Sequence, residues 1–230
     1  MEQRQSRQTE CVIPANVGSG ERMIVRVPVA DTVMAFTYFY IEDGTGHGFL
    51  IDPGAQADAL LRIIVEKNWV IESILLTHGH FDHFGAADAI RNALGIPIYA
   101  SEHAKRYLED PQMNLSAVMG RLPFVLHEVL PVKDGDILCL KDNPDFSLKV
   151  IAVPGHTEDS LMFYTEKHHA AFVGDTIFKG SPGTSEYPGG NQTALRKSII
   201  EKILALSGDT VLLSGHTDET TVSIEKHGGM

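Results

Sequence analysis

The sequence predicts an α/β fold in which two mixed sheets pack face to face and helices cover both outer sides, giving four layers. Three observations lead to this expectation. Segments rich in β-branched and aromatic residues recur in both halves of the chain, segments with helical spacing separate many of them, and several apolar segments end directly at histidine or aspartate. With 230 residues, 43% hydrophobic and 21% charged, the chain has the composition of one large globular domain. We expect a polar leader over residues 1–20 and a single domain over 21–230.

The first half of the chain alternates expected strands with expected helices. Strands rich in β-branched and aromatic residues are separated by Asp-Gly or Gly-rich turns, and they are expected at Met23–Pro28, Phe36–Ile41 and Gly48–Asp52. Helical spacing, buried runs and capping residues then predict a helix between Gln56 and Asn68, a strand at Ile74–Leu76, a helix over Gly85–Leu94, a strand at Ile98–Ala100 and a helix opened by Ser101.

The second half is expected to contain mainly strands. They are predicted at Val125–Leu130, Ile137–Leu140, Phe146–Val153, Leu161–Tyr164 and Ala170–Val173. A loop rich in Gly and Pro over Phe178–Gly190 then leads to a helix at Thr193–Ser207 and a last strand at Thr210–Leu213.

Charge and composition exclude several classes of partner. The formal net charge of −11 disfavours nucleic acid, because binding to phosphate backbones requires clustered Lys and Arg. No apolar run reaches the roughly 20 residues that span a bilayer, and no apolar signal core follows the polar N-terminus. The sequence therefore predicts a cytoplasmic protein that acts on a small molecule. Cys11 and Cys139 are too few for a disulfide framework.

The segment from Thr77 to His83 reads Thr-His-Gly-His-Phe-Asp-His and connects an expected buried strand with an expected helix. Side chains two apart on an extended backbone point the same way, so His78 and His80 can converge on one ion. Asp82 and His83, carried round the turn, can reach a neighbouring position. Imidazole and carboxylate are common ligands of zinc and iron, so this segment predicts a metal site.

Three further segments share one arrangement, in which an apolar strand ends in glycine and the next residue is a potential ligand. These ligands are His156, Asp175 and His216. Glycine before each of them allows a sharp turn and leaves space beside an ion. Residues at strand ends on a rigid scaffold are well placed for a preorganised site.

With these motifs the sequence resembles the metallo-β-lactamase superfamily, and within it the glyoxalase II-like hydrolases, over nearly the whole chain. The family pattern is Thr-His-x-His-x-Asp-His followed by Gly-His, Gly-Asp and Gly-His. The resemblance implies that the first metal is held by His78, His80 and His156, that the second is held by Asp82, His83 and His216, and that Asp175 bridges both. It implies two divalent ions, with zinc expected and iron or manganese as alternatives.

Two such ions would ionise a shared water near neutral pH, and the resulting hydroxide would attack a carbonyl carbon. Asp82 is expected to be both a ligand and the catalytic residue that holds the hydroxide. Thr77 and Thr157 have two open interpretations, orientation of the imidazoles or a simple strand-end role. No Gly-x-Ser-x-Gly motif offers a serine nucleophile.

The resemblance implies a thioester substrate of the hydroxyacyl-glutathione type. The family's Gly-Arg-Thr-Asp-x-Pro-Gly-Gly loop here runs from Gly183 to Gly190 with Thr184 in place of arginine, which alters the inherited substrate contacts. Tyr187 could present its phenol to a substrate or be an exposed residue without a role. The Leu108–Pro123 segment resembles a stretch that could cover the cleft.

Other activities remain open at this stage. A persulfide dioxygenase-like enzyme would use one iron held by His78, His156 and Asp175, and a lactone hydrolase would use the same hydroxide. A β-lactamase is disfavoured because Asp175 stands where those enzymes typically carry cysteine. A flavodiiron module is disfavoured because such relatives place glutamate at the position of His80. A metal-binding scaffold without turnover is the non-enzymatic alternative.

Overall fold

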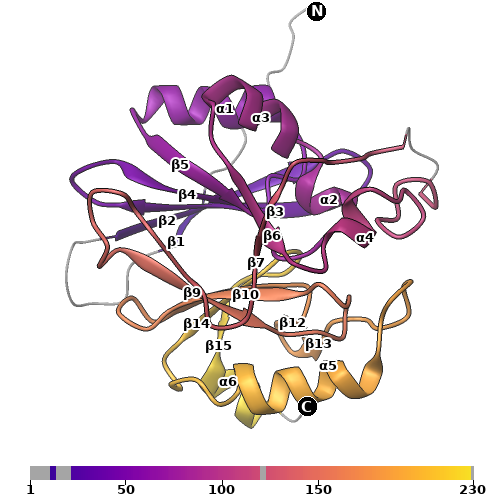
Figure 1. Ribbon diagram of the computed structural model, residues 1–230. Coiled ribbons are helices and arrows are strands. Elements are labelled where there is room, and N and C mark those ends of the chain that lie inside the picture. Colours follow the sequence, from indigo (N-terminus) through magenta and orange to yellow (C-terminus); the bar gives the residue numbers. More distant parts are fainter. Residues whose placement is uncertain (1–10, 14–21, 120–122, 229–230) are drawn as a thin grey trace, which may run out of the picture.

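The computed structural model describes residues 11–13, 22–119 and 123–228 of the chain. Two sheets face each other, and helices lie on the outer side of each (Figure 1). The outer helices are α1 (Ala57–Glu66), α3 (Ala87–Leu94), α5 (Gln192–Ser198) and α6 (Val222–His227). The predicted four-layer α/β arrangement is therefore confirmed.

The first sheet has seven strands in the order of the sequence, β1 to β7. The pairs from β1 to β4 are antiparallel, and those from β4 to β7 are parallel. Helices α1 and α3 supply two of the crossovers that parallel neighbours require. The strands are β1 (Cys11–Ile13), β2 (Arg22–Ala30), β3 (Met34–Glu42), β4 (His47–Ile51), β5 (Val70–Leu75), β6 (Ile98–Ser101) and β7 (Leu130–Val132).

The second sheet has six strands in the order β15-β14-β11-β10-β9-β8. Only β11 and β14 are parallel neighbours, and the other pairs are antiparallel. A separate hairpin is formed by β12 (Ile177–Phe178) and β13 (Ser181–Pro182). The strands of the sheet are β8 (Ile137–Cys139), β9 (Ser147–Ala152), β10 (Leu161–Thr165), β11 (Ala170–Gly174), β14 (Val211–Ser214) and β15 (Thr220–Thr221).

Central strands are buried on both faces, and alternate residues enter different cores. In β3, Phe39 and Ile41 pack with the helix-covered cluster of the first sheet, whereas Tyr38 and Tyr40 pack between the sheets. This follows from the two-residue period of a strand. Full burial of one such side chain contributes about 1.5–3 kcal/mol, so these strands fix the relative position of the layers.

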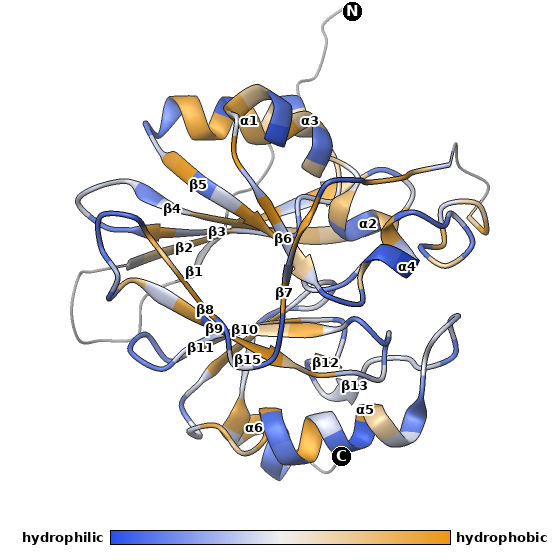
Figure 2. Ribbon diagram, viewed as in Figure 1, coloured by the Kyte–Doolittle hydropathy of each residue, from blue (hydrophilic) through white to orange (hydrophobic). Residues whose placement is uncertain are grey.

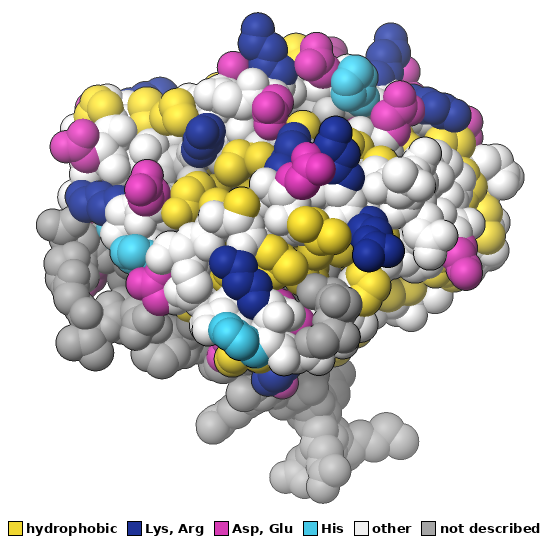
Figure 3. Space-filling model, turned by 90° about the horizontal axis from the view of Figure 1, so that it is seen from below, with side chains coloured by type: hydrophobic (Ala, Val, Ile, Leu, Met, Phe, Trp, Pro, Cys, Tyr) yellow, Lys and Arg dark blue, Asp and Glu magenta, His cyan; other side chains and the backbone are white. Residues whose placement is uncertain are grey.

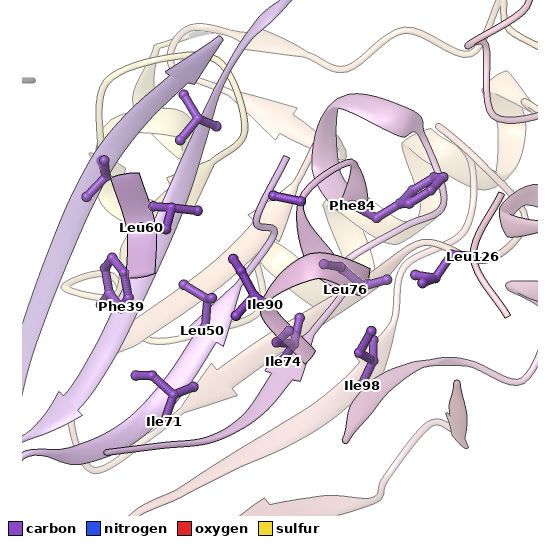
Figure 4. Close-up of a cluster of buried hydrophobic side chains, with 14 of the residues drawn as sticks. Phe39, Leu50, Leu60, Ile71, Ile74, Leu76, Phe84, Ile90, Ile98 and Leu126 are labelled. Atoms are coloured by element: carbon purple, nitrogen blue, oxygen red, sulfur yellow. The ribbon is translucent and has the colours of Figure 1, made fainter. Parts of the chain in front are cut away.

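Three apolar clusters correspond to the three interfaces between the four layers. Hydrophobic residues lie along the inward-facing sides of the helices and on the central strands (Figure 2). Figure 4 shows the cluster between the first sheet and its helices, to which Phe39 of β3, Leu60 of α1 and Ile90 of α3 contribute. The rigid scaffold that results carries its loops at the strand ends.

Two of the expected elements are wrong. The strand expected at Val125–Leu130 is absent, because Leu126 N–H donates to the Leu108 carbonyl and the segment packs there, so that β7 begins only at Leu130. The helix expected to open at Ser101 is also wrong, since Ser101 ends β6 and pairs with Val132. The helix that follows is the short α4 (Lys105–Leu108).

Other elements differ in extent from the expectation. The helix expected at Thr193–Ser207 is α5, capped by the Asn191 side chain, and continues as a π-helix over Ile199–Ile203. The helix expected over Gly85–Leu94 is preceded by the separate short helix α2 (Phe81–Phe84). The hairpin β12–β13, strand β15 and helix α6 were not expected. The expected leader over residues 1–20 lies outside the described residues, apart from Cys11–Ile13 in β1. Among the described helices, none combines the length and hydropathy of a membrane span.

Candidate metal centre

The seven residues predicted as ligands lie where five segments leave the two sheets or begin a helix. His78 and His80 follow β5, and Asp82 and His83 lie in α2. The other three follow strands of the second sheet, so the cluster joins both halves of the molecule. They are His156 after β9, Asp175 after β11 and His216 after β14.

Three imidazoles form the first group that could hold an ion. His80 Nδ1 lies 3.1 Å from His78 Nε2 and 3.0 Å from His156 Nε2. The rings stand nearly perpendicular to one another, with interplanar angles of 81–87°. Three nitrogen donors therefore converge on one point from two different sheets, as the spacing of His78 and His80 predicted.

The second group combines a carboxylate with two imidazoles. His216 Nε2 lies 3.4 Å from Asp82 Oδ2, and His83 Nε2 lies 3.9 Å from the same oxygen. The ligand atoms of these three residues all lie within 4.8 Å of one another. This is the set that the sequence placed around a second ion.

Asp175 lies between the two groups. Its Oδ1 is 3.4 Å from His83 Nε2, and its Oδ2 is 3.0 Å from His216 Nε2 and 3.7 Å from His156 Nε2. One carboxylate thus faces histidines from both groups, and His78, His83 and Asp175 form a third candidate set. Asp175 is therefore placed where its two oxygens could contact ions in both groups.

Hydrogen bonds outside the cluster orient three of the imidazoles. His83 Nδ1 lies 2.9 Å from Asp52 Oδ2, His156 Nδ1 lies 2.7 Å from the Thr184 carbonyl, and His216 Nδ1 lies 2.8 Å from the Met34 carbonyl. Each acceptor holds a proton on Nδ1, so Nε2 is the nitrogen that faces the cluster and that would offer its lone pair to an ion. Such partners fix the tautomer of metal-binding histidines.

Asp52 is a functional residue that the sequence reasoning missed. It is buried and accepts hydrogen bonds from the Thr77 N–H at 2.8 Å and the Thr77 hydroxyl at 2.6 Å, besides facing His83. Its φ of 50° is strained for a residue other than glycine. Thr77 therefore supports the site through Asp52, whereas the Thr157 hydroxyl bonds to Ser160 within its own turn.

The glycines that precede the ligands leave space that a side chain would fill. A Cβ at Gly215 would lie 2.4 Å from Asp175 Oδ1 and 2.5 Å from His83 Cε1. Gly174 has a φ of +51°, and a Cβ there would lie 2.5 Å from the Thr77 hydroxyl. The predicted reason for glycine at these two positions is confirmed.

The cluster passes a test of fit for divalent ions. His83 Nε2 and Asp175 Oδ1 are buried and make no hydrogen bond among the described residues, although both lie within the cluster. An ion with bonds of about 2.0–2.1 Å in tetrahedral geometry keeps its ligand atoms about 3.3 Å apart, close to the separations found here. Buried polar atoms without partners are costly, and a metal ion would satisfy them.

The pKa shifts divide the histidines into two classes. Burial lowers the pKa of His80 to about 3, and the neighbouring His156 adds to this effect. Burial also acts to lower the pKa of His216, but Asp175 and Asp82 raise it to about 10. The first group therefore offers neutral imidazoles, whereas an ion entering the second group must displace a proton from His216.

Two aromatic rings border the cluster on its outer side. The Tyr187 ring lies edge-on to His80 and His156, with centroids 5.7 and 6.2 Å away. The Phe178 ring lies 6.0 Å from His216. Tyr187 is 38% exposed, so one of its sides is open to solvent beside the first group.

Asp159 is a buried carboxyl group close to the ligand loop and outside the ligand set. Neither of its oxygens has hydrogen-bond geometry with a described residue. Burial raises its pKa from 3.8 to about 7, and the nearby Thr157 hydroxyl and Gly79 N–H offset this only in part. Its side chain is therefore protonated in the folded protein at pH values where the unfolded chain has lost the proton.

Replacement of Asp159 should have a pH-dependent effect on stability. Since the folded-state pKa is raised, the carboxyl group lowers the free energy of unfolding progressively as the pH rises from about 4 to above 7. Asp159→Asn should therefore be more stable than the original protein by about 1–3 kcal/mol at pH 8, with little difference at pH 4. Urea unfolding of the metal-free proteins at both pH values measures this. An equal difference at the two pH values would contradict the assignment.

Comparisons with known proteins agree with the geometry. Residues 31–216 match the model of the Metallo-beta-lactamase superfamily. The probable metallo-hydrolase YqgX of Bacillus subtilis is 35% identical over 201 residues, which cover 87% of this chain and 93% of that protein. The hydroxyacylglutathione hydrolase GloC of Haemophilus influenzae is 31% identical over 188 residues, covering 81% and 87% respectively.

Two solved structures are also similar over most of their length. The BLEG-1 B3 metallo-beta-lactamase has a TM-score of 0.81 and 33% identity, covering 90% of this chain and 98% of that chain. TTHA1623 in a di-iron-bound form has a TM-score of 0.78 and 30% identity, covering 88% and 98%. From the family match, the fold and the converging histidines and aspartates, the chain belongs to the metallo-β-lactamase superfamily.

Proposed function

We propose that the protein is a metal-dependent hydrolase. It would hydrolyse an acyl bond of a small molecule at a site that holds two metal ions. His78, His80 and His156 would hold one ion, Asp82, His83 and His216 would hold the other, and Asp175 would contact both. The observation that carries this proposal is the position of Asp175, whose two oxygens face histidines of both groups at 3.0–3.7 Å.

When bound, two such ions supply a water ionised near neutral pH and a positive charge that polarises a carbonyl oxygen. The side chain of His83 is fully buried, whereas those of Asp82 and His216 are 12% and 23% exposed. A substrate would therefore approach on the side of Asp82 and His216. Burial acts to raise the pKa of Asp82, but His83 and His216 lower it, so the group is an ionised acceptor.

The ionised Asp82 carboxylate has two functions in this proposal. One oxygen belongs to the second group, and the carboxylate can accept a hydrogen bond from the attacking water and orient it toward the carbonyl carbon. The aromatic ring of Tyr187 lies next to His80 of the first group, and that of Phe178 lies next to His216 of the second. Orientation of the nucleophile by Asp82 favours attack on a bound carbonyl.

The donor set favours zinc or iron over magnesium and calcium, because five of the seven groups are imidazoles. Zinc is the expected ion. The relative TTHA1623 is known in a di-iron-bound form, which supports iron as the alternative.

A thioester is the proposed substrate class. The support comes from the motif resemblance to glyoxalase II-like hydrolases and from the relative GloC, a hydroxyacylglutathione hydrolase. A nucleic-acid partner is not proposed, since the net charge is −11 and basic and acidic side chains are interspersed on the face seen in Figure 3.

Hydrolysis of a β-lactam is the second candidate. The sequence argued against it because Asp175 replaces a cysteine, yet the BLEG-1 relative, 33% identical, is a B3 metallo-beta-lactamase. Hydrolysis of a lactone requires the same attacking hydroxide and the same polarised carbonyl oxygen as hydrolysis of a thioester. The thioester, the lactone and the β-lactam are therefore compared in one experiment.

A substrate panel with defined metal content tests the proposed function. Protein loaded with zinc, iron or manganese is assayed on a lactoyl-glutathione-type thioester, an aliphatic lactone and a β-lactam, and for oxygen consumption with a persulfide. We expect thioester hydrolysis at least about tenfold above the other activities, abolished by a chelator and by Asp82→Ala. Asp145→Ala, at an exposed turn, is the matched control. Oxygen consumption without hydrolysis would reject the proposal in favour of a dioxygenase.

A further inference from the structure

Tyr107 is a fully buried tyrosine in the short helix α4, outside the predicted ligand set. Helix α4 lies with α2 in the upper half of the molecule, whereas β12, β13 and α5 lie in the lower half (Figure 1). The side chain of Tyr107 nevertheless reaches loops from both halves. It is therefore placed to couple them.

The Cβ end of the Tyr107 side chain packs against the loop that carries His78 and His80. A Cβ at Gly79 would lie 2.4 Å from Tyr107 Cβ, so Gly79 fits directly against this residue. The Tyr107 ring is also edge-on to the His80 ring, with centroids 6.4 Å apart. The backbone between His78 and His80 thus rests on Tyr107.

The hydroxyl group at the other end contacts the loop that carries His156. The Glu158 N–H donates to Tyr107 Oη at 2.9 Å, across 51 residues of sequence. Glu158 follows His156 by two residues within a turn closed by the Gly155 N–H donating to the Thr157 carbonyl at 2.9 Å. The hydroxyl therefore anchors the turn that positions His156.

The same hydroxyl contacts the loop that carries Tyr187. Gly189 has a φ of +82°, and a Cβ there would lie 1.9 Å from Tyr107 Oη and 2.9 Å from Tyr107 Cζ. Only glycine fits at this approach. The position of Tyr187, two residues earlier, thus depends on how closely the loop backbone approaches Tyr107.

We propose that Tyr107 is a positioning residue that holds three loops of the metal centre in register, those of His80, His156 and Tyr187. It acts through the backbone of these loops, and among the described residues its hydroxyl bonds to the Glu158 N–H and to no proposed ligand. The expected effect of Tyr107 on turnover rests on the proposed function. Its expected effect on metal affinity does not depend on which substrate the protein hydrolyses.

The hydroxyl is suited to this role at all working pH values. Burial raises the pKa of Tyr107, and the nearby carboxyl groups of Asp159 and Glu158 add to the effect. The hydroxyl remains neutral, so it can accept the Glu158 N–H without the cost of a buried phenolate.

Tyr107→Phe tests the hydroxyl while keeping the ring against Gly79. We expect a chelator competition assay to show about tenfold weaker binding of the more weakly held ion, as for other losses of a group that supports a ligand. The melting temperature should fall by no more than about 4 °C, since one hydrogen bond is lost in a chain of this size. We expect kcat to fall about tenfold with KM within a factor of about two.

Gly189→Ala tests the close approach between the loop and the hydroxyl. In the original background the added methyl group collides with Tyr107 Oη, and we expect kcat to fall about tenfold. In the Tyr107→Phe background the closest colliding atom is gone and only the milder contact with Cζ, at 2.9 Å, remains, so the further loss should be at least about threefold smaller. This non-additivity is specific to the contact, because strain at the positive φ is the same in both backgrounds.

Tyr164→Phe is the matched control, since Tyr164 is a partly buried tyrosine in β10 that packs with the apolar cluster between the second sheet and its helices. It should leave metal binding and kcat unchanged. Unaltered metal binding in Tyr107→Phe, or additive losses in the double variant, would overturn the positioning role without affecting the proposed function. Weaker metal binding in Tyr107→Phe, in a protein that hydrolyses none of the substrates, would support the positioning role and reject the function.

Discussion

Asp175→Ala is expected to reduce turnover by at least about 10³-fold and to release both ions. A metal ion contributes several kcal/mol of charge stabilisation in the transition state, and each 1.36 kcal/mol corresponds to a factor of ten. Asp175 faces histidines of both groups, so its loss should weaken both positions. Metal analysis after gel filtration, together with turnover, measures both effects.

The charge balance of the cluster gives the same prediction independently. Burial acts to lower the pKa of His83, but Asp175, Asp52 and Asp82 together raise it well above its usual value. Without Asp175, His216 loses its nearest acidic partner, and His83 loses the carboxylate that lies 3.4 Å from its Nε2. Asp209→Ala, at an exposed position, is the control and should retain both ions. A variant at Asp175 that kept two ions and more than about a tenth of the turnover would contradict the bridging role.

Asp52→Ala should have the second largest effect, on stability as well as on metal binding. It leaves the buried Thr77 N–H and hydroxyl without their acceptor and removes the partner of His83. Breaking a buried pair of this kind costs about 3–5 kcal/mol. Loss of the partner of a metal-binding histidine weakens the metal by about 10–100-fold. Urea unfolding of the metal-free protein and chelator competition measure the two effects separately.

Asp52→Asn separates orientation from packing. The amide oxygen can still accept the Thr77 N–H, but the amide nitrogen would face His83 Nδ1 and donate to it. That arrangement moves the imidazole proton to Nε2, where it blocks metal binding. We therefore expect the asparagine variant to recover most of the stability and little of the metal affinity. Equal recovery of both quantities would show that Asp52 acts by packing alone.

The sequence predicted which side chains would cluster, because the signal of each is local. His78, His80, Asp82 and His83 lie within six consecutive residues, and the other three ligands each follow a glycine at the end of an apolar strand. Such patterns reflect the turn that each ligand requires. The structure brings all seven together at the facing ends of the two sheets, as that reasoning predicted.

The supporting residues could not be predicted because their contacts span the chain. Asp52 acts on Thr77, 25 residues away, and Tyr107 acts on Glu158, 51 residues away. No periodicity or spacing records such pairs. A partial signal was available for Asp52, since it ends an apolar strand and is followed by Pro53 and Gly54.

The prediction of a strand over Val125–Leu130 failed for a related reason. Its apolar residues satisfy strand propensity, but Leu126 is buried against the helix-covered cluster and its N–H bonds to the Leu108 carbonyl. Tertiary contacts with the end of α4 thus outweighed local preference. The segment that follows α4 supplies the Asn114 carbonyl that accepts the Phe81 N–H at the start of α2, so its irregular path helps to position Asp82 and His83.

The central claim is that seven side chains form one centre for two ions. The most direct test is an anomalous-difference map from crystals of protein purified without added metal, with data collected on both sides of the absorption edge of the ion found. We expect two peaks next to Asp175, one among His78, His80 and His156 and the other among Asp82, His83 and His216. A single peak, or peaks away from these side chains, would contradict the claim.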